Sequence, residues 1–578
     1  MHRKLRNQLI GVLATAVGLS MALVFVPSAA SNAQSVEPRS SGTSGTFIVA
    51  QPWGTMPDNF NPYAPSGANA PGTKSCIYQS LYYINGATGA QTPLLATGYQ
   101  WTDNNLKLVV TTRSGVKWSN GDTFSAADVA FTFNYLKTYP TMDVNGIWAT
   151  NPLVSVIANN ANTVTFTFSK PDTPAALAIL YGTDGSPSDI LPSSIWQSIT
   201  SPSTYTNTSP VGTGPFTLST FGTSSITYVK NPNYWGTAPS INEVVFSSVD
   251  SNTTAELELE NGTIDMSYDA ISDPAVTYVA KAPKYNDYFW PQTNMNYLYF
   301  NTAKPPFSQV AFRKAVAEAM NPTLLAKRAY FGTLAAATGG MEADVIPAQV
   351  SEWVPSSLAS LEWTFSDNAA IATLKAAGYK WKGTCPKSCQ LESPSGHVFP
   401  TFTVLSGGPG WTDYISQIDN IAAELKPIGI SATPVQEPWS TYSNDFDRGY
   451  LDFLLCWGNG NGPTPYYQYS YMFSPKDDVP IGQVANTNWE RFKSAVITGA
   501  LNSYASSSSL TVQKADMVKV EEVVLKEVPV LALTGRGNWL DYQTRTFTGF
   551  PSATNPYNDG SASDQEGAML VYLNVKPA

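Results

Sequence analysis

The chain has 578 residues, which is more than one hydrophobic core usually organises, so we expect two or more domains. Hydrophobic residues make up 43% and charged residues only 13%, a composition typical of a soluble globular protein with an uncharged polar surface. The 33 Lys and Arg against 43 Asp and Glu give a net charge of −10, which argues against binding to nucleic acid or anionic lipid, since both require concentrated positive charge.

Residues 1–33 have the pattern of a signal peptide. Basic residues at the start precede a mostly apolar stretch, Leu9–Val26, and small residues at 28–33 offer cleavage sites after Ala30 or Ala33. The alternative is an uncleaved membrane anchor, because about 18 apolar residues just span a bilayer. Both alternatives predict export, to the periplasm or the outer face of the cytoplasmic membrane. The first Cys is Cys76, so a lipoprotein is not expected.

Short strand-like runs alternate with helical runs after a flexible linker at 34–46, and this alternation predicts an α/β fold. One helix is predicted to begin after Ser125 as its N-cap, with Asp128 as the third helical residue. The other expected helices are 308–320, 412–426 and 512–528. The expected strands are 47–50, 401–406, 450–456 and 530–533.

The four Cys belong to a chain that we expect to be exported, where thiols tend to oxidise. Cys385 and Cys389 have three residues between them and are our candidate for a small disulfide. A metal site at this pair would need two more ligands, and no nearby His or Cys provides them. Cys76 and Cys456 either pair across the fold or remain buried thiols.

The scarcity of His limits the catalytic possibilities. The chain has 2 His: His2 lies in the leader, and His397 ends a run typical of a solvated turn. No HExxH motif and no Gly-Lys pair occurs, which argues against that type of zinc site and against a Walker phosphate loop. We therefore expect no catalytic residue, no metal and no cofactor.

Several motifs occur in an order that resembles a known family. Trp118-Ser-Asn-Gly121 and Phe124–Phe133 form the centre of the longest of them, which begins at Leu94. The other segments are Pro210–Phe216 with Asn231–Trp235, Leu259–Asp265, and Tyr299–Ala315. Together they resemble the extracellular solute-binding proteins of the peptide/nickel class, family 5, which serve ABC importers. The residues themselves suit turns and capped helices, so we assign them to the fold and not to a ligand.

The resemblance implies a two-lobed periplasmic-binding-protein fold of type II, similar to the large cluster C proteins, with a hinge and a cleft between the lobes. Because the chain crosses between the lobes, the domains are discontinuous. The expected first lobe covers 47–290, with an inserted subdomain at about 76–190, and is completed by 541–578. The second lobe covers 291–540.

The family comparison also implies where the cleft lies. In peptide-binding relatives an Asp near a strand-end Trp holds the ligand ammonium, but the matching stretch here contains Trp457, Asn459 and Asn461. An Arg holds the ligand carboxylate in dipeptide-binding relatives, but the window around Trp411 contains no basic residue. A buried charge without a partner is costly, so this cleft is expected to favour uncharged groups. The alternative is that Asp413, Asp445 or Asp447 is the missing carboxylate.

Aromatic and amide side chains near these segments are the candidate ligand contacts, because flat rings stack on sugars or cover peptide side chains. For Asn61, which precedes a Pro, an Asx-turn role is an equal alternative. The full candidate set is Trp53, Asn61, Trp411, Trp457, Asn459, Asn461, Tyr466 and Tyr467.

The predicted function is therefore that of a monomeric, non-enzymatic solute-binding component of an ABC importer, with a membrane permease as its partner. The family default ligand is an oligopeptide, and the alternative ligand is a neutral oligosaccharide. A nickel or metal-chelate receptor is a further alternative within the family. An alternative of another class is a secreted carbohydrate-active hydrolase, which would need paired carboxylates that no motif here singles out.

Overall fold

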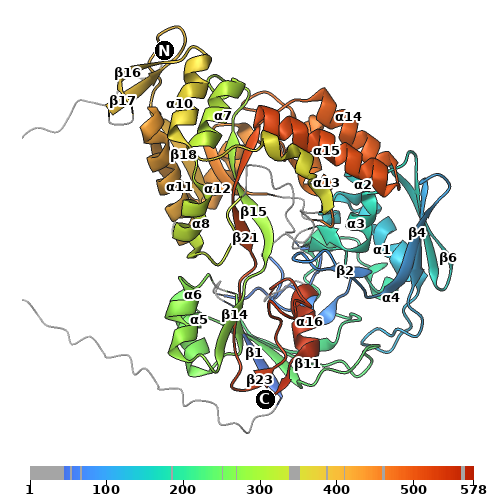
Figure 1. Ribbon diagram of the computed structural model, residues 1–578. Coiled ribbons are helices and arrows are strands. Elements are labelled where there is room, and N and C mark those ends of the chain that lie inside the picture. Colours follow the sequence, from blue (N-terminus) through green and yellow to red (C-terminus); the bar gives the residue numbers. More distant parts are fainter. Residues whose placement is uncertain are drawn as a thin grey trace, which may run out of the picture. The chain divides into compact units, whose positions relative to one another are not determined.

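A seven-stranded sheet takes its strands from both ends of the chain. The computed structural model describes residues 45–51, 55–64, 68–183, 186–249, 251–268, 270–337, 352–385, 388–408, 411–458, 462–561 and 566–578. The strands of this sheet are β1 (Thr46–Gln51), β10 (Phe216–Phe221), β11 (Ser225–Lys230), β12 (Glu243–Ser248), β13 (Met266–Ser267), β14 (Asn286–Phe289) and β22 (Leu540–Gln543). Their order is β10–β11–β12–β1–β13–β22–β14. Figure 1 labels β1, β11 and β14 of this sheet in the lower part of the molecule. The predicted strand at 47–50 is confirmed as β1, which pairs in parallel with β12.

A five-stranded sheet is built from the middle and later parts of the chain. Its strands are β15 (Gln292–Phe300), β18 (Phe402–Gly407), β19 (Ala432–Glu437), β20 (Phe453–Trp457) and β21 (Val530–Gly537), in the order β19–β18–β20–β15–β21. The three strands predicted here are confirmed. β20 begins at Phe453, later than predicted, because the preceding helix still occupies this stretch: Gly449 has a φ of +72° and the Tyr450 N–H donates to the carbonyl of Asp445 (2.7 Å).

A four-stranded antiparallel sheet lies between these two in sequence. It consists of β4 (Ala96–Thr102), β5 (Lys107–Thr112), β6 (Leu153–Asn160) and β7 (Thr163–Phe168), in the order β4–β5–β7–β6. Along β7 the residues alternate between buried and half-buried, as expected for a strand with one face on a core.

The predicted helices are present within two residues of their expected ends. The longer helices are α1 (Ala126–Thr138), α3 (Ala175–Leu180), α5 (Asn252–Asn261), α7 (Val310–Ala319), α8 (Pro322–Tyr330), α10 (Asp367–Ala376), α11 (Thr412–Leu425), α12 (Trp439–Arg448), α13 (Tyr466–Met472), α14 (Ala495–Ser506), α15 (Leu510–Glu527) and α16 (Glu566–Asn574). At the start of α1, Ser125 accepts from Ala127 N (3.2 Å) and Asp128 accepts from Ser125 N (2.9 Å). This confirms the predicted N-cap and satisfies two amides that the helix itself leaves without partners.

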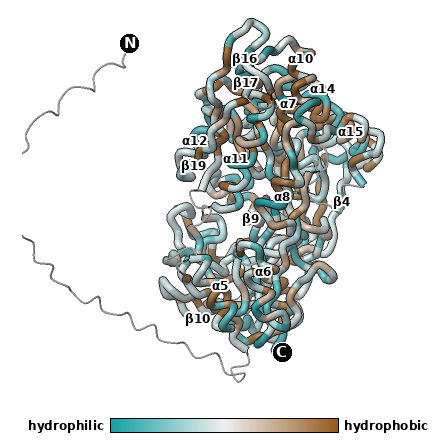
Figure 2. Tube along the Cα trace, turned by 60° about the vertical axis from the view of Figure 1, so that its left-hand side comes forward, coloured by the Kyte–Doolittle hydropathy of each residue, from teal (hydrophilic) through white to brown (hydrophobic). Residues whose placement is uncertain are grey.

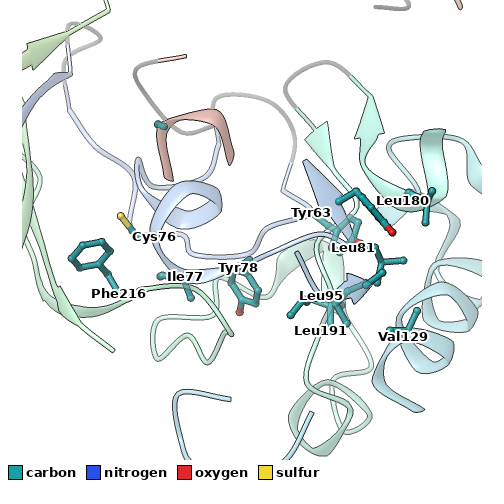
Figure 3. Close-up of a cluster of buried hydrophobic side chains, with 14 of the residues drawn as sticks. Tyr63, Cys76, Ile77, Tyr78, Leu81, Leu95, Val129, Leu180, Leu191 and Phe216 are labelled. Atoms are coloured by element: carbon teal, nitrogen blue, oxygen red, sulfur yellow. The ribbon is translucent and has the colours of Figure 1, made fainter. Parts of the chain in front are cut away.

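Apolar side chains of these elements form the cores. Hydrophobic and hydrophilic stretches alternate along the part of the tube that is visible in Figure 2. One buried cluster joins the seven-stranded and four-stranded sheets, and two others cover the five-stranded sheet. In the first cluster, Tyr78 and Leu95 lie among side chains from segments far apart in sequence, including Leu180 and Phe216 (Figure 3). Burial of this kind supplies most of the stability of such a domain.

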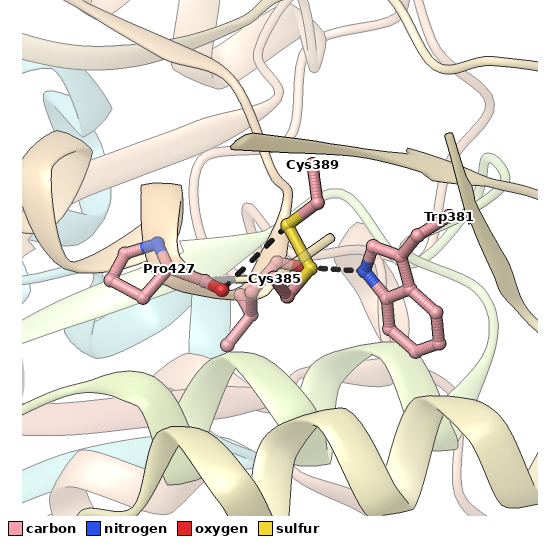
Figure 4. The surroundings of a disulfide bond; sticks show 5 residues. Trp381, Cys385, Cys389 and Pro427 are labelled. Atoms are coloured by element: carbon pink, nitrogen blue, oxygen red, sulfur yellow. Dashed lines mark hydrogen bonds between the residues drawn. A yellow bond between two sulfur atoms is a disulfide. The ribbon is translucent and has the colours of Figure 1, made fainter. Parts of the chain in front are cut away.

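The predicted disulfide between Cys385 and Cys389 is present (Figure 4). It joins β16 (Lys380–Thr384) and β17 (Ser388–Glu392), which form an antiparallel hairpin. Trp381 of this hairpin donates from Nε1 to the carbonyl of Ile428 (2.9 Å). Cys76 and Cys456 form no disulfide and are buried in different clusters, which settles the alternative left open by the sequence.

The predicted leader, linker and division into two lobes are the remaining expectations about domain organisation. The predicted leader at 1–33 and nearly all of the linker at 34–46 lie outside the described residues. Within the described ranges, no helix combines the length and the apolar character needed to cross a bilayer. All five strands of the second sheet lie between Gln292 and Gly537. The division into two lobes that move about a hinge stays a prediction.

Glu490 provides a test of how this core is stabilised. Its side chain is fully buried beside Arg491, and burial raises its pKa from 4.5 to about 8. Between these two values the folded protein keeps a proton that the unfolded chain has lost, so ionisation opposes folding as the pH rises. We expect the Glu490→Gln variant, which cannot ionise, to gain stability relative to the wild type across this window, by up to ~1.4 kcal/mol per pH unit.

Chemical denaturation of both proteins between about pH 5 and about pH 8 measures this difference. A difference in the free energy of unfolding that does not change with pH would contradict the assignment of this titration to Glu490.

Candidate functional site

Four strands of the five-stranded sheet run in the same direction and end at one edge. β18 is parallel to both β19 and β20, and β15 is antiparallel to both β20 and β21. The carboxyl ends of β18, β19, β20 and β21 therefore share an edge with the amino end of β15. In open α/β sheets this is the edge at which ligands bind.

Three indole rings gather at this edge, and we call Trp411, Trp439 and Trp457 the tryptophan platform. Trp439 and Trp457 are stacked, with ring centroids 5.6 Å apart and an angle of 3° between their planes. Trp411 lies 6.1 Å from Trp457 and 6.5 Å from Trp439. Trp439 is 49% exposed and Trp411 is 39% exposed, so large apolar faces are open to solvent. Such exposed aromatic patches are typical of binding sites.

Local backbone structure places each indole at the edge. Trp457 is the last residue of β20, and Trp439 is the first residue of α12, directly after Pro438. Trp411 follows a turn in which its N–H donates to the carbonyl of Gly408 (2.8 Å). Gly408 has a φ of +70°, a conformation that favours Gly.

A positive charge lies beside the platform. The guanidinium carbon of Arg536, near the end of β21, is 5.2 Å from the ring centroid of Trp457 and 5.2 Å from that of Trp539. Arg536 is opposite Asn294 in the sheet, and Trp457 is opposite Asn296, so β15 brings the two side chains together. The guanidinium group is half-buried and planar, a geometry suited to carboxylates.

Hydrogen bonds beneath the platform fix its supporting residues. Tyr414 donates to Asn296 Oδ1 (2.8 Å), and Asn296 donates to the hydroxyl of Tyr330 (2.7 Å). Tyr330 in turn donates to Asp413 Oδ2 (3.0 Å). Burial raises the pKa of Asp413, and the nearby Arg536 partly opposes this rise. Asp413, one of the alternative carboxylates, is thus held by Tyr330 at the base of the site.

The other predicted contacts are placed differently. Tyr466 and Tyr467 lie on α13, where Tyr466 stacks on Tyr504 (4.4 Å between centroids) and Tyr467 donates to the carbonyl of Pro174 (3.4 Å). Asn61 is 2% exposed, and its amide donates to the carbonyls of Pro202 and Tyr205. These bonds, with acceptance from the Tyr63 N–H (3.0 Å), favour the Asx-turn role for Asn61.

Trp53, Asn459 and Asn461 lie outside the described residues. His397 is in the expected turn, where its N–H donates to Ser393 Oγ (3.0 Å). In the described ranges, no group of three His, Cys, Asp or Glu side chains is arranged to hold a metal ion.

Two residues of the site were missed by the sequence analysis. Trp439 lies after β19, outside the two windows that the family comparison singled out. Arg536 lies near the end of β21 and is outside those windows too, so it was missed for the same reason. Both residues could have been found from the direction of the predicted strands. Side chains at the carboxyl ends of parallel strands meet at one edge of the sheet, so a Trp or Arg at such an end is a candidate for the site.

Gly408 provides a test of how the platform is built. A Cβ atom at this position would overlap the indole of Trp411. We expect Gly408→Ala to displace this ring, to change the near-UV circular dichroism of the indoles, and to lower the free energy of unfolding by about 1 kcal/mol or more.

Gly396→Ala is the matched control, because Gly396 also has a left-handed φ (+83°) but its added Cβ would meet no atom within 4 Å. An identical spectrum for Gly408→Ala and the wild type would show that the turn does not position Trp411.

Comparisons with known proteins agree with this architecture. A sequence profile described as "Bacterial extracellular solute-binding proteins, family 5 Middle" matches residues 90–479, more than half of the chain. The nickel-binding periplasmic protein of Escherichia coli (strain K12) is 24% identical over 441 residues, which cover 74% of this chain and 77% of that protein. The dipeptide-binding protein of the same organism is 24% identical over 444 residues, covering 72% and 77%.

Solved structures are similar over a larger part of the chain. The crystal structure of a periplasmic oligopeptide-binding protein of an oligopeptide ABC transporter from Thermotoga maritima has a TM-score of 0.83 and 25% identity, covering 93% of this chain and 100% of that chain. Its mannohexaose-bound structure has a TM-score of 0.76 and 24% identity, covering 93% and 99%. The predicted periplasmic-binding-protein fold is thereby confirmed. The chain belongs to the family 5 bacterial extracellular solute-binding proteins and is the solute-binding component of an ABC importer.

Proposed function

We propose that this protein captures an extracellular oligopeptide on the tryptophan platform and delivers it to a membrane permease. The observation that carries the proposal is the group of three indoles at the carboxyl edge of the five-stranded sheet, two of them more than one-third exposed. The oligopeptide-binding protein from Thermotoga maritima and the dipeptide-binding protein from Escherichia coli support the ligand class.

The platform suits a ligand with apolar or planar groups. Covering an exposed indole removes apolar surface from water, worth roughly 25 cal/mol per Å². Indole faces also pack on peptide planes and on side chains without fixing their identity. The site would therefore accept varied sequences, which is the requirement for a peptide scavenger.

Arg536 would supply the charged contact that the sequence analysis did not find. Its guanidinium lies over Trp457 and Trp539 at the same edge, and a peptide has one terminal carboxylate. A hydrogen bond to a charged group typically contributes about 1.5–3 kcal/mol. Arg536 is therefore the residue that would distinguish an anionic ligand from a neutral one.

A neutral oligosaccharide is the second candidate ligand. The flat, nearly parallel faces of Trp439 and Trp457 suit stacking on sugar rings. The mannohexaose complex from Thermotoga maritima supports this alternative.

The mode of action follows from the two-lobed fold. A solute that binds both lobes would favour the closed state over the open state, and the permease would recognise this closed state. We place the protein in the periplasm or at the outer face of the cytoplasmic membrane, as a monomer that is not lipid-modified. It would act without catalysis and without a cofactor.

The platform can be tested with single variants. We expect Trp439→Ala and Trp457→Ala each to weaken solute binding at least tenfold, because each removes an indole face worth more than ~1.4 kcal/mol. Isothermal titration with mixed-sequence peptides and with neutral oligosaccharides measures the affinities. Phe365→Ala is the control, since Phe365 is similarly exposed (48%) but makes no ring contact with the platform in the described chain.

Unchanged affinity in both Trp variants would overturn the assignment of the site. Product analysis of the same mixtures tests the hydrolase alternative, because shortened glycans would show turnover instead of capture.

The charge at Arg536 separates the two ligand classes. We expect Arg536→Gln to weaken peptide binding at least tenfold and to leave neutral oligosaccharide binding within about twofold. Arg113→Gln is the matched control, because the Arg113 guanidinium also stacks on an indole, that of Trp235 (4.1 Å).

C-terminally amidated peptides give a second comparison. If they bind the wild type as tightly as the free acids do, Arg536 does not hold the terminal carboxylate.

A further inference from the structure

A second concave site lies away from the tryptophan platform. It is a cavity of about 210 Å³ between two stretches of the chain. One wall comes from β2 (Tyr82–Ile84), β4 and α3, and the other comes from residues 463–513. An engineered cavity of about 150 Å³ in another protein admits benzene, so this one has room for a ring.

The walls of the cavity are apolar and aromatic, with a polar rim. The apolar lining includes Tyr82, Trp101, Leu177, Leu180, Pro463 and Tyr467. Gln91, Thr173, Ser508 and Gln513 provide uncharged polar groups. No Asp, Glu, Lys, Arg or His is found among the described residues that line it. A charged group that enters the cavity meets no opposite charge in this lining, so the cavity favours uncharged groups.

Hydrogen bonds between the two walls preserve the shape of the cavity. Thr173 donates from its N–H to the carbonyl of Ala505 (2.8 Å) and from Oγ1 to the carbonyl of Ser507 (3.1 Å). Tyr467 donates to the carbonyl of Pro174 (3.4 Å). The first two bonds satisfy carbonyls at the end of α14, which the helix itself leaves without partners. A site that is already formed costs less to fill.

The cavity and the platform are close enough for one solute. Trp457 of the platform and Pro463 of the cavity are six positions apart in the sequence, so their Cα atoms are at most about 22 Å apart. An extended peptide of roughly seven residues covers such a distance, as does an oligosaccharide of several units.

We propose that this cavity is a second subsite of the same solute, and that it receives an uncharged ring-shaped group while another part of the solute rests on the platform. This proposal rests on the proposed function. It narrows the substrate class to oligomers in which an uncharged ring lies several units away from the part that contacts the platform. The shared chemistry is an uncharged ring, either an aromatic side chain or a sugar ring.

The test blocks the opening of the cavity without disturbing a core. Ser508 lines the cavity and is exposed, in the loop between α14 and α15, so Ser508→Trp should fold normally. Ser509→Trp is the matched control, because it places the same side chain one residue further on, at an exposed position that does not line the cavity.

The probes are two series of defined compounds. One is a set of heptapeptides of Ala and Ser with a single Phe at each position in turn, together with a dipeptide. The other is a set of linear mannose oligomers from two units to six. Titration calorimetry with wild type, Ser508→Trp, Ser509→Trp and Trp457→Ala measures each affinity.

We expect Ser508→Trp to weaken the best long probe at least tenfold and Ser509→Trp to leave it unchanged. The shortest member of the series should be insensitive to Ser508→Trp but sensitive to Trp457→Ala. Replacing the Phe of the best peptide by Lys should weaken binding to the wild type and have little effect on Ser508→Trp.

The two proposals fail in different ways. If Trp457→Ala weakens binding and Ser508→Trp does not weaken any long probe, the second subsite is wrong and the platform stands. If Trp457→Ala has no effect on any probe, the platform itself is wrong. If the wild type binds the Lys peptide as tightly as the Phe peptide, the inference that the subsite selects uncharged groups is wrong. The series that responds to Ser508→Trp identifies the ring as aromatic or sugar.

Discussion

The direction of four parallel strands is the constraint on which the site depends. β18, β19, β20 and β21 all end at one edge of the five-stranded sheet, so residues from positions 411, 439, 457 and 536 meet there. None of these residues is near another in sequence: Trp457 and Arg536 lie at the ends of β20 and β21, and Trp411 and Trp439 follow β18 and β19 by a few residues. The hydrogen-bonded ladder thus converts four separate strand ends into a single surface.

The site combines exposed aromatic faces with a network of hydrogen-bonded polar side chains. Tyr330, Asp413, Tyr414 and Asn296 are joined by hydrogen bonds under the indoles, which rigidifies the support of the rings. Above this base the indoles remain open, and the only formal charge that stacks on them in the described chain is Arg536. In the proposed function, the rings would bind varied groups and Arg536 would select for one charge.

The sequence was a better guide to the fold than to the site. Hydrophobic periodicity and capping residues located α1, α7, α11 and α15, because these signals act over a few neighbouring residues. Trp411 and Trp457 were found through local family motifs, and the structure brings them within 6.1 Å of each other. Trp439 and Arg536 were missed because their role depends on sheet order, a non-local property. For Asn61 the sequence left two roles open, and only the hydrogen bonds of the folded chain favour the turn.

Trp539 connects the platform to the seven-stranded sheet through side-chain contacts. The chain passes between the five-stranded and seven-stranded sheets at residues 538–539, after β21 and before β22. Trp539 lies in this passage, where it contacts both Arg536 and Tyr268, the latter directly after β13 of the seven-stranded sheet. A solute that draws the guanidinium of Arg536 toward itself would loosen its stacking on Trp539. Binding at the platform would then change the contacts of Trp539, a residue of the segment that joins the two sheets.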